Sequence, residues 1–304
     1  MRLPDPVSDL LPEGDTALIK NALTNLDRVA RESVGSAVGE KEKGSCTVSF
    51  SGGIDSSILA VLANSLHEMG LFSLGETASH DMRFLNDMNF PDHNLIAPLI
   101  ESVTKSDIEI AAKKVVKLIN ASTLSQLEDC TAFHLIGEKL RGHSKNARYI
   151  ITANGPDELF CGYDRFRRLV DSEGYSVLDK EIARSLQVAR ELKEAVKNVL
   201  SEFNLASLDP FLSDEFVAFC QQGVPVQLKI RMGDDRLRKR LWRLYGRTLG
   251  LPESIVTKPK KAMQYSMGIH KILFSMIKRG ELTLNSEHKQ ERAGSAWRNS
   301  DTAL

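Results

Sequence analysis

A glycine-containing loop joins a predicted strand to a predicted helix, and this junction is the feature that most constrains the fold. The segment Cys46–Phe50 has the composition of a short strand. It is followed by Ser51–Ser57, with the sequence SGGIDSS, and then by apolar residues at helical spacing from Ile58 to Met69. Glycines let such a turn curl tightly, so that its amides and the helix N-terminus can face a phosphate. Asp55 in this loop suits the magnesium ion that accompanies phosphate.

Further strand-like runs alternate with helical patterns. Strands are predicted at 71–75, 94–99 and 149–152, and helices at 16–34, 58–69, 106–119 and 127–140. This alternation predicts an α/β fold, a doubly wound parallel sheet with helices on both faces, followed by a helical C-terminal portion without strands from about residue 164. In such sheets ligands bind beyond the carboxyl ends of the strands. The first and last predicted strands both end in glycine-containing loops, 51–57 and 153–162.

Composition restricts the class of protein. The chain has 304 residues, 42% of them hydrophobic, with a formal net charge of zero. It can form a large core and carries no overall signal for nucleic acid or an anionic membrane. Four widely spaced cysteines and the lack of a long apolar run predict a cytoplasmic protein without disulfides, zinc or a membrane helix. We expect an N-terminal helical extension over 1–44 with a loop at 35–44, one domain over 45–285, and a flexible tail over 286–304.

Three segments carry a family resemblance. The SGGIDSS loop resembles the SGGxDS loop of the PP-loop ATP pyrophosphatases, Rossmann-like enzymes that bind the pyrophosphate of ATP. Thr152–Tyr163, with the sequence TANGPDELFCGY, resembles SGEGSDELFGGY of the asparagine synthetases. Leu251–Ile269 is similar to a segment near the end of that family's synthetase domain. The resemblance covers residues 45–269 and concerns the C-terminal, ATP-using domain only.

The resemblance implies an ATP-dependent carbon–nitrogen ligase that forms AMP and pyrophosphate. A substrate carboxylate attacks the α-phosphate of ATP, and ammonia or another amine then displaces AMP from the acyl-adenylate. Magnesium, lysine and oriented amides stabilise the charge of such a transition state. ATP and Mg²⁺ are therefore the expected cofactors, and asparagine made from aspartate is the default product.

Matching positions in the family assign residues to the site. Asp55 and Asp157 are expected to bind metal or pyrophosphate, and Lys261 or Lys260 to neutralise the phosphates or the oxyanion, with Lys261 favoured. Asn154 stands where the family has a glutamate that serves as base for the amine. An asparagine can orient an amine but cannot accept its proton. The residues expected around ATP are Phe50, Ser51, Gly52, Gly53, Asp55, Ser56, Ser57, Leu74, Thr152, Ala153 and Gly155.

The family's glutaminase domain has a cysteine directly after the initiator methionine, whereas position 2 here is Arg2. We therefore expect this chain not to hydrolyse glutamine. Its nitrogen would come from free ammonia, another amine or a separate glutaminase subunit. The oligomeric state, including a homodimer, stays open.

Simpler roles stay open for several of these residues. Asp157 and Glu158 could cap the helix that begins there, and the lysines of 258–261 could form a solvated charge run. The basic stretch 231–247 could be one exposed helix face, or a binding face for tRNA or an acidic carrier protein. Its basic residues are Arg231, Arg236, Arg238, Lys239, Arg240, Arg243 and Arg247, and Leu237, Leu241 and Leu244 would be buried.

Two other functions also stay open. One is a PP-loop enzyme that adenylates a group on tRNA or a carboxylate on a protein. The other is a nucleotide-binding subunit without activity of its own, paired with a separate glutaminase. Pyrophosphate release that depends on aspartate and ammonia would indicate the ligase, and release that depends only on bulk tRNA would indicate the second function. Binding of ATP without turnover would indicate the inactive subunit.

Overall fold

Five parallel strands form the central sheet. The computed structural model describes residues 16–76, 93, 95, 97–233, 238–258 and 268–285. The strands are β1 Cys46–Ser49, β2 Gly70–Glu76, β3 Leu99–Val103, β4 Tyr149–Ile151 and β5 Ala206–Leu208. Their order in the sheet is β3-β2-β1-β4-β5, and every neighbouring pair is parallel. The predicted α/β fold with a parallel sheet is confirmed.

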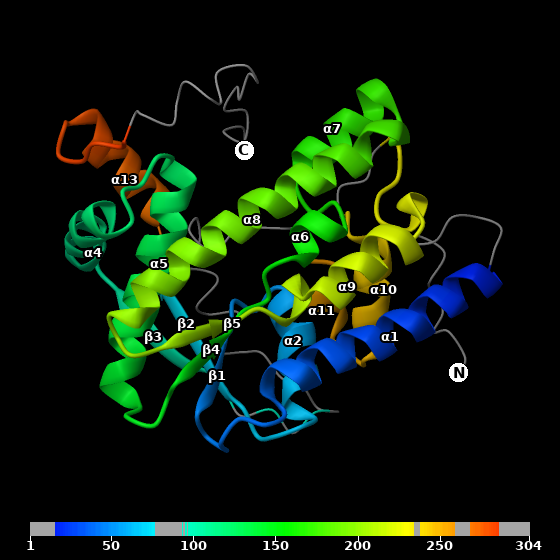
Figure 1. The fold of residues 1–304 in the computed structure, drawn as a ribbon, viewed down its shortest axis with the longest axis horizontal. Helices are drawn as coiled ribbons and strands as arrows, with labels where there is room; N and C mark the ends of the chain where they lie inside the picture. The colour runs from blue at the N-terminus through cyan, green and yellow to red at the C-terminus, as the bar shows by residue number, and fades with distance from the viewer. Residues whose placement is uncertain are drawn as a thin grey trace.

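Helices cover both faces of the sheet (Figure 1). The helices that position the site are α1 Thr16–Val38, α2 Ile54–Asn64, α6 Pro156–Leu159, α7 Asp164–Glu173, α9 Asp214–Ala218, α10 Arg240–Thr248 and α11 Glu253–Val256. The others are α4 Lys105–Leu118, α5 Leu124–His143, α8 Leu178–Ser201 and α13 Ile269–Lys278. The 3-10 turn η3 Pro210–Leu212 follows β5. No helix in the described part of the chain is long and apolar enough to cross a membrane.

Alternating strand residues point into two separate cores. On β2, Leu71 belongs to the core that includes α1, α2, α10 and α11, whereas Phe72 belongs to the core that includes α4, α5 and α13. On β4, Ile151 and Ile150 divide in the same way. Side chains of consecutive strand residues leave opposite faces, so a strand buried on both faces reads as a continuous apolar run. The long helix α8 contributes residues to both cores.

Three of the predicted boundaries were wrong for local reasons. The predicted strand at 94–99 instead begins at Leu99, because Pro98 lacks the amide that a strand ladder needs. Helix α2 ends at Asn64, whose side chain accepts a hydrogen bond from the amide of Met69 and closes the turn into β2. Helix α1 runs through to Val38, which is fully buried, so part of the predicted loop at 35–44 is helical.

The prediction of a strand-free region after residue 164 was also wrong. Residues Ala206–Leu208 form β5 and extend the sheet beyond β4. Three residues are too few to give a periodic signal in the sequence, and pairing with β4 is what makes them a strand. The error matters because β5 ends at a residue of the candidate site.

Helix α1 packs into the same core as the sheet. Leu26 is completely buried, whereas Leu18 on the same helix is 43% exposed. We predict that Leu26→Ala lowers the free energy of unfolding by about 2–5 kcal/mol, because it leaves a cavity in this core. Leu18→Ala is the matched control and should change it by about 0.5 kcal/mol or less. Urea denaturation followed by the fluorescence of the buried Trp242 measures both. An unchanged transition for Leu26→Ala would mean that α1 is a separable extension.

Candidate functional site

The loop after β1 holds its shape through its own serines. Gly52 has φ of 66°, a conformation that favours glycine. The Ser56 hydroxyl accepts from the amide of Ser51 at 3.2 Å and donates to the carbonyl of Gly53 at 3.2 Å, and the Ser51 and Ser56 hydroxyls lie 3.1 Å apart. Ser51 is exposed, whereas Ser56 and Ser57 are buried. Within this loop Gly52 is also buried, Gly53 and Asp55 are partly buried, and Ser51 is the exposed residue.

The loop after β4 lies beside the first loop, because β1 and β4 are neighbours in the sheet. Gly155 has φ of 113°, and a Cβ atom there would lie 2.5 Å from the carbonyl oxygen of Phe211. A side chain at this position would collide with backbone, so glycine is required. The expected position of adenosine lies along the same edge: Phe50, Leu74 and Thr152 are buried, and Ala153 is partly buried.

A buried lysine joins the two loops. The Nζ atom of Lys239 lies 2.6 Å from Asp55 Oδ2 and 2.8 Å from Asp157 Oδ1, and the Lys239 side chain is 1% exposed. Trp242 Nε1 donates to the other Asp55 oxygen at 2.9 Å. A Cβ atom on Gly162 would lie 2.3 Å from Lys239 Cε, so this glycine leaves space for the lysine. The two carboxylates that the sequence assigned to the site are thus brought together, with an ammonium group between them.

Lys239 reaches this position because of an unusual backbone turn. Arg238 and Lys239 have φ of 51° and 52°, and α10 begins directly after them. Arg238 Nε donates to the carbonyl of Gly162 at 2.9 Å, and Arg243 Nε donates to the carbonyl of Arg238 at 2.9 Å. These contacts hold the segment before α10 against the loop that contains Asp157. Two consecutive residues in the left-handed region are strained, and such a backbone conformation persists only where surrounding contacts stabilise it.

The interpretation of 231–247 as an exposed helix face was therefore wrong. Lys239, Arg240 and Arg243 are buried, while Leu241 and Leu244 are buried as predicted. The same burial means that these three cations cannot present a face to tRNA or an acidic carrier protein. Arg231 is exposed, and Arg236 and Leu237 lie outside the described residues.

Asp157 and Glu158 lie in the short helix α6, whose first residue follows Gly155, and no side chain caps this helix. Asp157 turns to Lys239. Glu158 instead accepts a hydrogen bond from the Tyr163 hydroxyl at 2.7 Å. Burial raises the pKa of the Glu158 carboxyl to about 7, and the neighbouring charge of Asp157 is the second largest cause of this increase. Burial likewise raises the pKa of Tyr163 well above its ordinary value.

Asn154 makes a contact that the sequence did not predict. Its Nδ2 atom donates to Asp209 Oδ1 at 3.1 Å, and the Thr152 hydroxyl donates to the same oxygen at 2.5 Å. Asp209 directly follows β5 and was missed because that strand was missed. The signal available in the sequence is a short β-compatible run that stops at an Asp-Pro pair, which is typical of a strand end.

Two carboxylates are suitable ligands for Mg²⁺. Here, however, Asp55 and Asp157 are each paired with Lys239, and both oxygens of Asp55 accept hydrogen bonds. No group of three or more His, Cys, Asp or Glu residues able to hold a metal occurs within the described residues. A magnesium ion shared by these two carboxylates does not fit unless Lys239 moves. The predicted lysines Lys260 and Lys261 lie outside the described residues.

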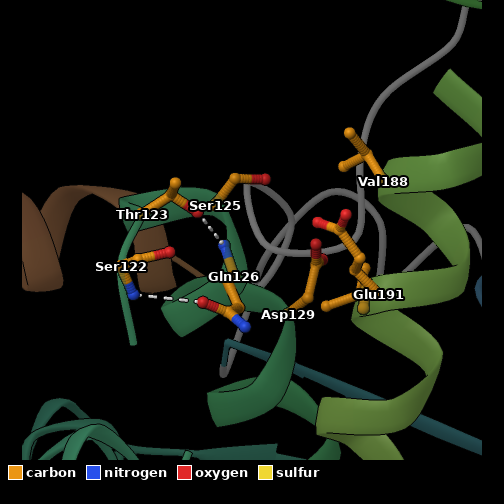
Figure 2. A pocket seen from close by; sticks show the side chains of 8 residues that line it. Ser122, Thr123, Ser125, Gln126, Asp129, Val188 and Glu191 are labelled. Atoms are coloured by element: carbon orange, nitrogen blue, oxygen red, sulfur yellow. Dashed lines mark hydrogen bonds between the residues drawn. The ribbon is translucent and has the colours of Figure 1, made fainter. Parts of the chain in front are cut away.

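A pocket occurs elsewhere in the molecule, between the first turns of α5 and helix α8 (Figure 2). It is lined by Ser122, Thr123, Ser125, Gln126, Asp129, Val188, Glu191 and Leu192. None of the residues expected to bind ATP lines it. The candidate site therefore rests on the convergence of the two loops and not on this pocket.

Comparison with known proteins gives consistent relatives. Residues 26–207, more than half of the chain, match the family described as asparagine synthase. A protein of Methanocaldococcus jannaschii, named as a glutamine-hydrolyzing asparagine synthetase, is 24% identical over 288 residues, covering 84% of this chain and 51% of the relative. Asparagine synthetase domain-containing protein 1 of mouse and of human is 30% identical over 138 residues, covering 44% of this chain and 22% and 21% of theirs. The chain spans about half of the archaeal relative and about a fifth of the mammalian ones.

The ion pairs of Lys239 lead to a prediction about stability and metal binding. Lys239→Met leaves two partly buried carboxylates without their cation, and we expect it to destabilise the protein by about 3–5 kcal/mol. Added Mg²⁺, without nucleotide, should stabilise this variant more than the wild type, because the place between Asp55 and Asp157 is then open. Thermal unfolding with and without Mg²⁺ measures both effects. Lys197→Met, at a side chain that is 66% exposed, is the control.

Equal melting temperatures for the Lys239 and Lys197 variants would contradict the buried ion pairs. An equal response of variant and wild type to Mg²⁺ would count against a metal site at the two carboxylates.

The raised pKa of Glu158 leads to a second prediction. The folded protein holds the Glu158 proton up to pH about 7, whereas the ordinary value is 4.5. The native state therefore binds more protons than the unfolded state between these values, and stability falls as the pH rises through them. Glu158→Gln should remove this slope and make the variant more stable than the wild type above pH 7, by on the order of 3 kcal/mol. Urea denaturation across this pH range measures the free energy of unfolding, with Glu194→Gln at an exposed side chain as the control. The same dependence of this free energy on pH in both variants and the wild type would contradict the prediction.

Proposed function

Since this chain belongs to the asparagine synthase family, we propose that it activates a carboxylate with ATP and converts it into an amide. The carboxylate attacks the α-phosphate of ATP and releases pyrophosphate, and ammonia or another amine then displaces AMP. The observation that carries this proposal is the meeting of Asp55 and Asp157, from two loops far apart in sequence, at one edge of a parallel sheet. Asparagine made from aspartate is the first product to test.

The loop after β1 supports a site for the pyrophosphate of ATP. Ser51, Gly52 and Gly53 form the turn that leads into α2, and the N-terminus of this helix carries partial positive charge. We propose that the backbone amides of this turn and the exposed Ser51 side chain bind the phosphates. The hydroxyls of Ser56 and Ser57 are buried, so Ser56 serves to hold the loop in shape.

Charge in the site points to further cations. Asp55 and Asp157 together carry two negative charges, and Lys239 carries one positive charge. One negative charge is left before the phosphates of ATP arrive, so binding of ATP needs additional cations. We propose that Mg²⁺ bound to ATP and a lysine of the pair Lys260 and Lys261 supply them. Lys239 keeps the two carboxylates in fixed places whichever of these cations is present.

The test of this function is a pyrophosphate-release screen of the pure protein. ATP, Mg²⁺ and ammonium chloride are supplied with aspartate, with other small carboxylic acids, or with bulk tRNA. We expect release that depends on a small carboxylate and an equal amount of AMP. ADP as the product would refute the proposed reaction. Release that depends only on tRNA would favour the alternative of tRNA modification, and binding of ATP without release would favour an inactive subunit.

A substitution in the first loop gives the corresponding prediction. Asp55→Asn removes the charge that pairs with Lys239, and we expect carboxylate-dependent pyrophosphate release to fall by roughly 100-fold or more, as for loss of an oriented charged group. Asp214→Asn, at a side chain that is 93% exposed, should leave release unchanged. Comparison of initial rates at saturating ATP measures the effect. Release near the wild-type rate from Asp55→Asn would remove Asp55 from the site.

A further inference from the structure

Asp209 lies at the carboxyl end of β5, beside the loop that follows β4. The two strands are parallel, and the amide of Thr152 donates to the carbonyl of Leu208 at 2.9 Å. Asp209 precedes the 3-10 turn η3, a place where a carboxylate commonly caps the backbone. Its side chain makes no such capping hydrogen bond. The carboxylate points instead to the side chains of the β4 loop.

The Asp209 carboxylate is buried, with two neutral donors on one oxygen and one long ion pair on the other. The Asp209 side chain is 2% exposed, and its Oδ1 atom is held by the neutral donors of Thr152 and Asn154. Among the described residues Lys193 pairs with this carboxylate; its Nζ atom lies 3.8 Å from Oδ2, and its side chain is 37% exposed. Within the described residues, Oδ2 accepts no hydrogen bond. A buried polar atom without a donor is costly, so its presence calls for a function.

Asp209 also decides which way the Asn154 amide faces. A carboxylate can only accept hydrogen bonds, so the Nδ2 group of Asn154 must point toward it. The carbonyl oxygen Oδ1 of Asn154 is then the group left to bind a ligand, since the side-chain hydrogen bonds of Asn154 among the described residues are limited to the one that Nδ2 donates to Asp209. Asn154 is only partly buried. The pair thus presents an acceptor oxygen with a negative charge behind it.

We propose that Asn154 and Asp209 together bind the amine substrate, ammonia or a small primary amine, with Asp209 as the positioning residue. The proposal rests on the proposed function. The nitrogen lone pair forms the C–N bond, the bond from the acyl carbon to the AMP oxygen breaks, and AMP leaves with that electron pair. The nitrogen is positively charged until it loses a proton to water. The charge of Asp209 stabilises this cationic nitrogen, which the neutral Asn154 could not do alone.

The experiment separates the two half-reactions in Asp209→Asn. Adenylation is followed as carboxylate-dependent exchange of labelled pyrophosphate into ATP without amine, using the acid that gives most pyrophosphate in the screen. Amide formation is followed with ammonium chloride. We expect exchange to stay within about 3-fold of the wild type, amide formation to fall by roughly 100-fold, and the KM for ammonium to rise, as for loss of a stabilising charge near the reacting nitrogen. Asp214→Asn should change neither half-reaction.

A double variant that moves the carboxylate from position 209 to position 154 tests the role of its charge. The double variant Asn154→Asp with Asp209→Asn preserves one carboxylate and one amide in contact, and we expect it to form at least about 10-fold more amide than Asp209→Asn alone. A parallel loss of both half-reactions with a lower melting temperature would show a purely structural role and overturn the proposal, as would unchanged amide formation in Asp209→Asn. Wild-type protein without any pyrophosphate exchange would instead refute the proposed function itself.

Discussion

The structure depends on one buried cation between two acidic loops. Lys239, Asp55 and Asp157 come from three distant parts of the chain, and the lysine and Asp55 are 184 positions apart in sequence. Each charge alone would be costly to bury, and only their close contact offsets that cost. Removing the lysine leaves two carboxylates without their cation, whereas removing one carboxylate leaves the lysine paired with the other. The ion pairs therefore fix the relative positions of the loop after β1, the loop after β4 and the start of α10.

This arrangement follows from the order of the strands. The chain leaves β1 toward β2 and β3 on one side and returns to place β4 on the other side of β1. The loops after β1 and β4 then diverge from adjacent strand ends, which is where parallel sheets bind ligands. Apolar residues on both faces of the strands, such as Ile150 and Ile151, hold the sheet rigid beneath them. A rigid sheet can place short polar loops with the accuracy that a reacting site needs.

The sequence predicted what is local and missed what depends on distant contacts. The loop SGGIDSS and the segment containing Asp157 could be recognised because each combines strand, glycine and helix within a few residues. Lys239 was assigned to an exposed face, because helical spacing of leucines does not show the left-handed residues that turn it inward. Asp209 was missed because β5 has three residues and becomes a strand only through β4. In both cases the missing information was tertiary pairing.

The loop after β4 contacts both the Lys239 ion pairs and the carboxylate of Asp209. Through Asp157 it contacts Lys239 and the loop after β1, and through Thr152 and Asn154 it contacts Asp209 at the end of β5. A lysine between two carboxylates thus lies on one side of this loop, and the buried carboxylate of Asp209 lies on the other. In the proposed function the first side binds phosphates together with the cations that accompany ATP, whereas the carboxylate on the second side stabilises an amine that becomes cationic as it attacks. In the proposed reaction the acyl carbon would lie between them, where AMP leaves toward the first side and nitrogen enters from the second.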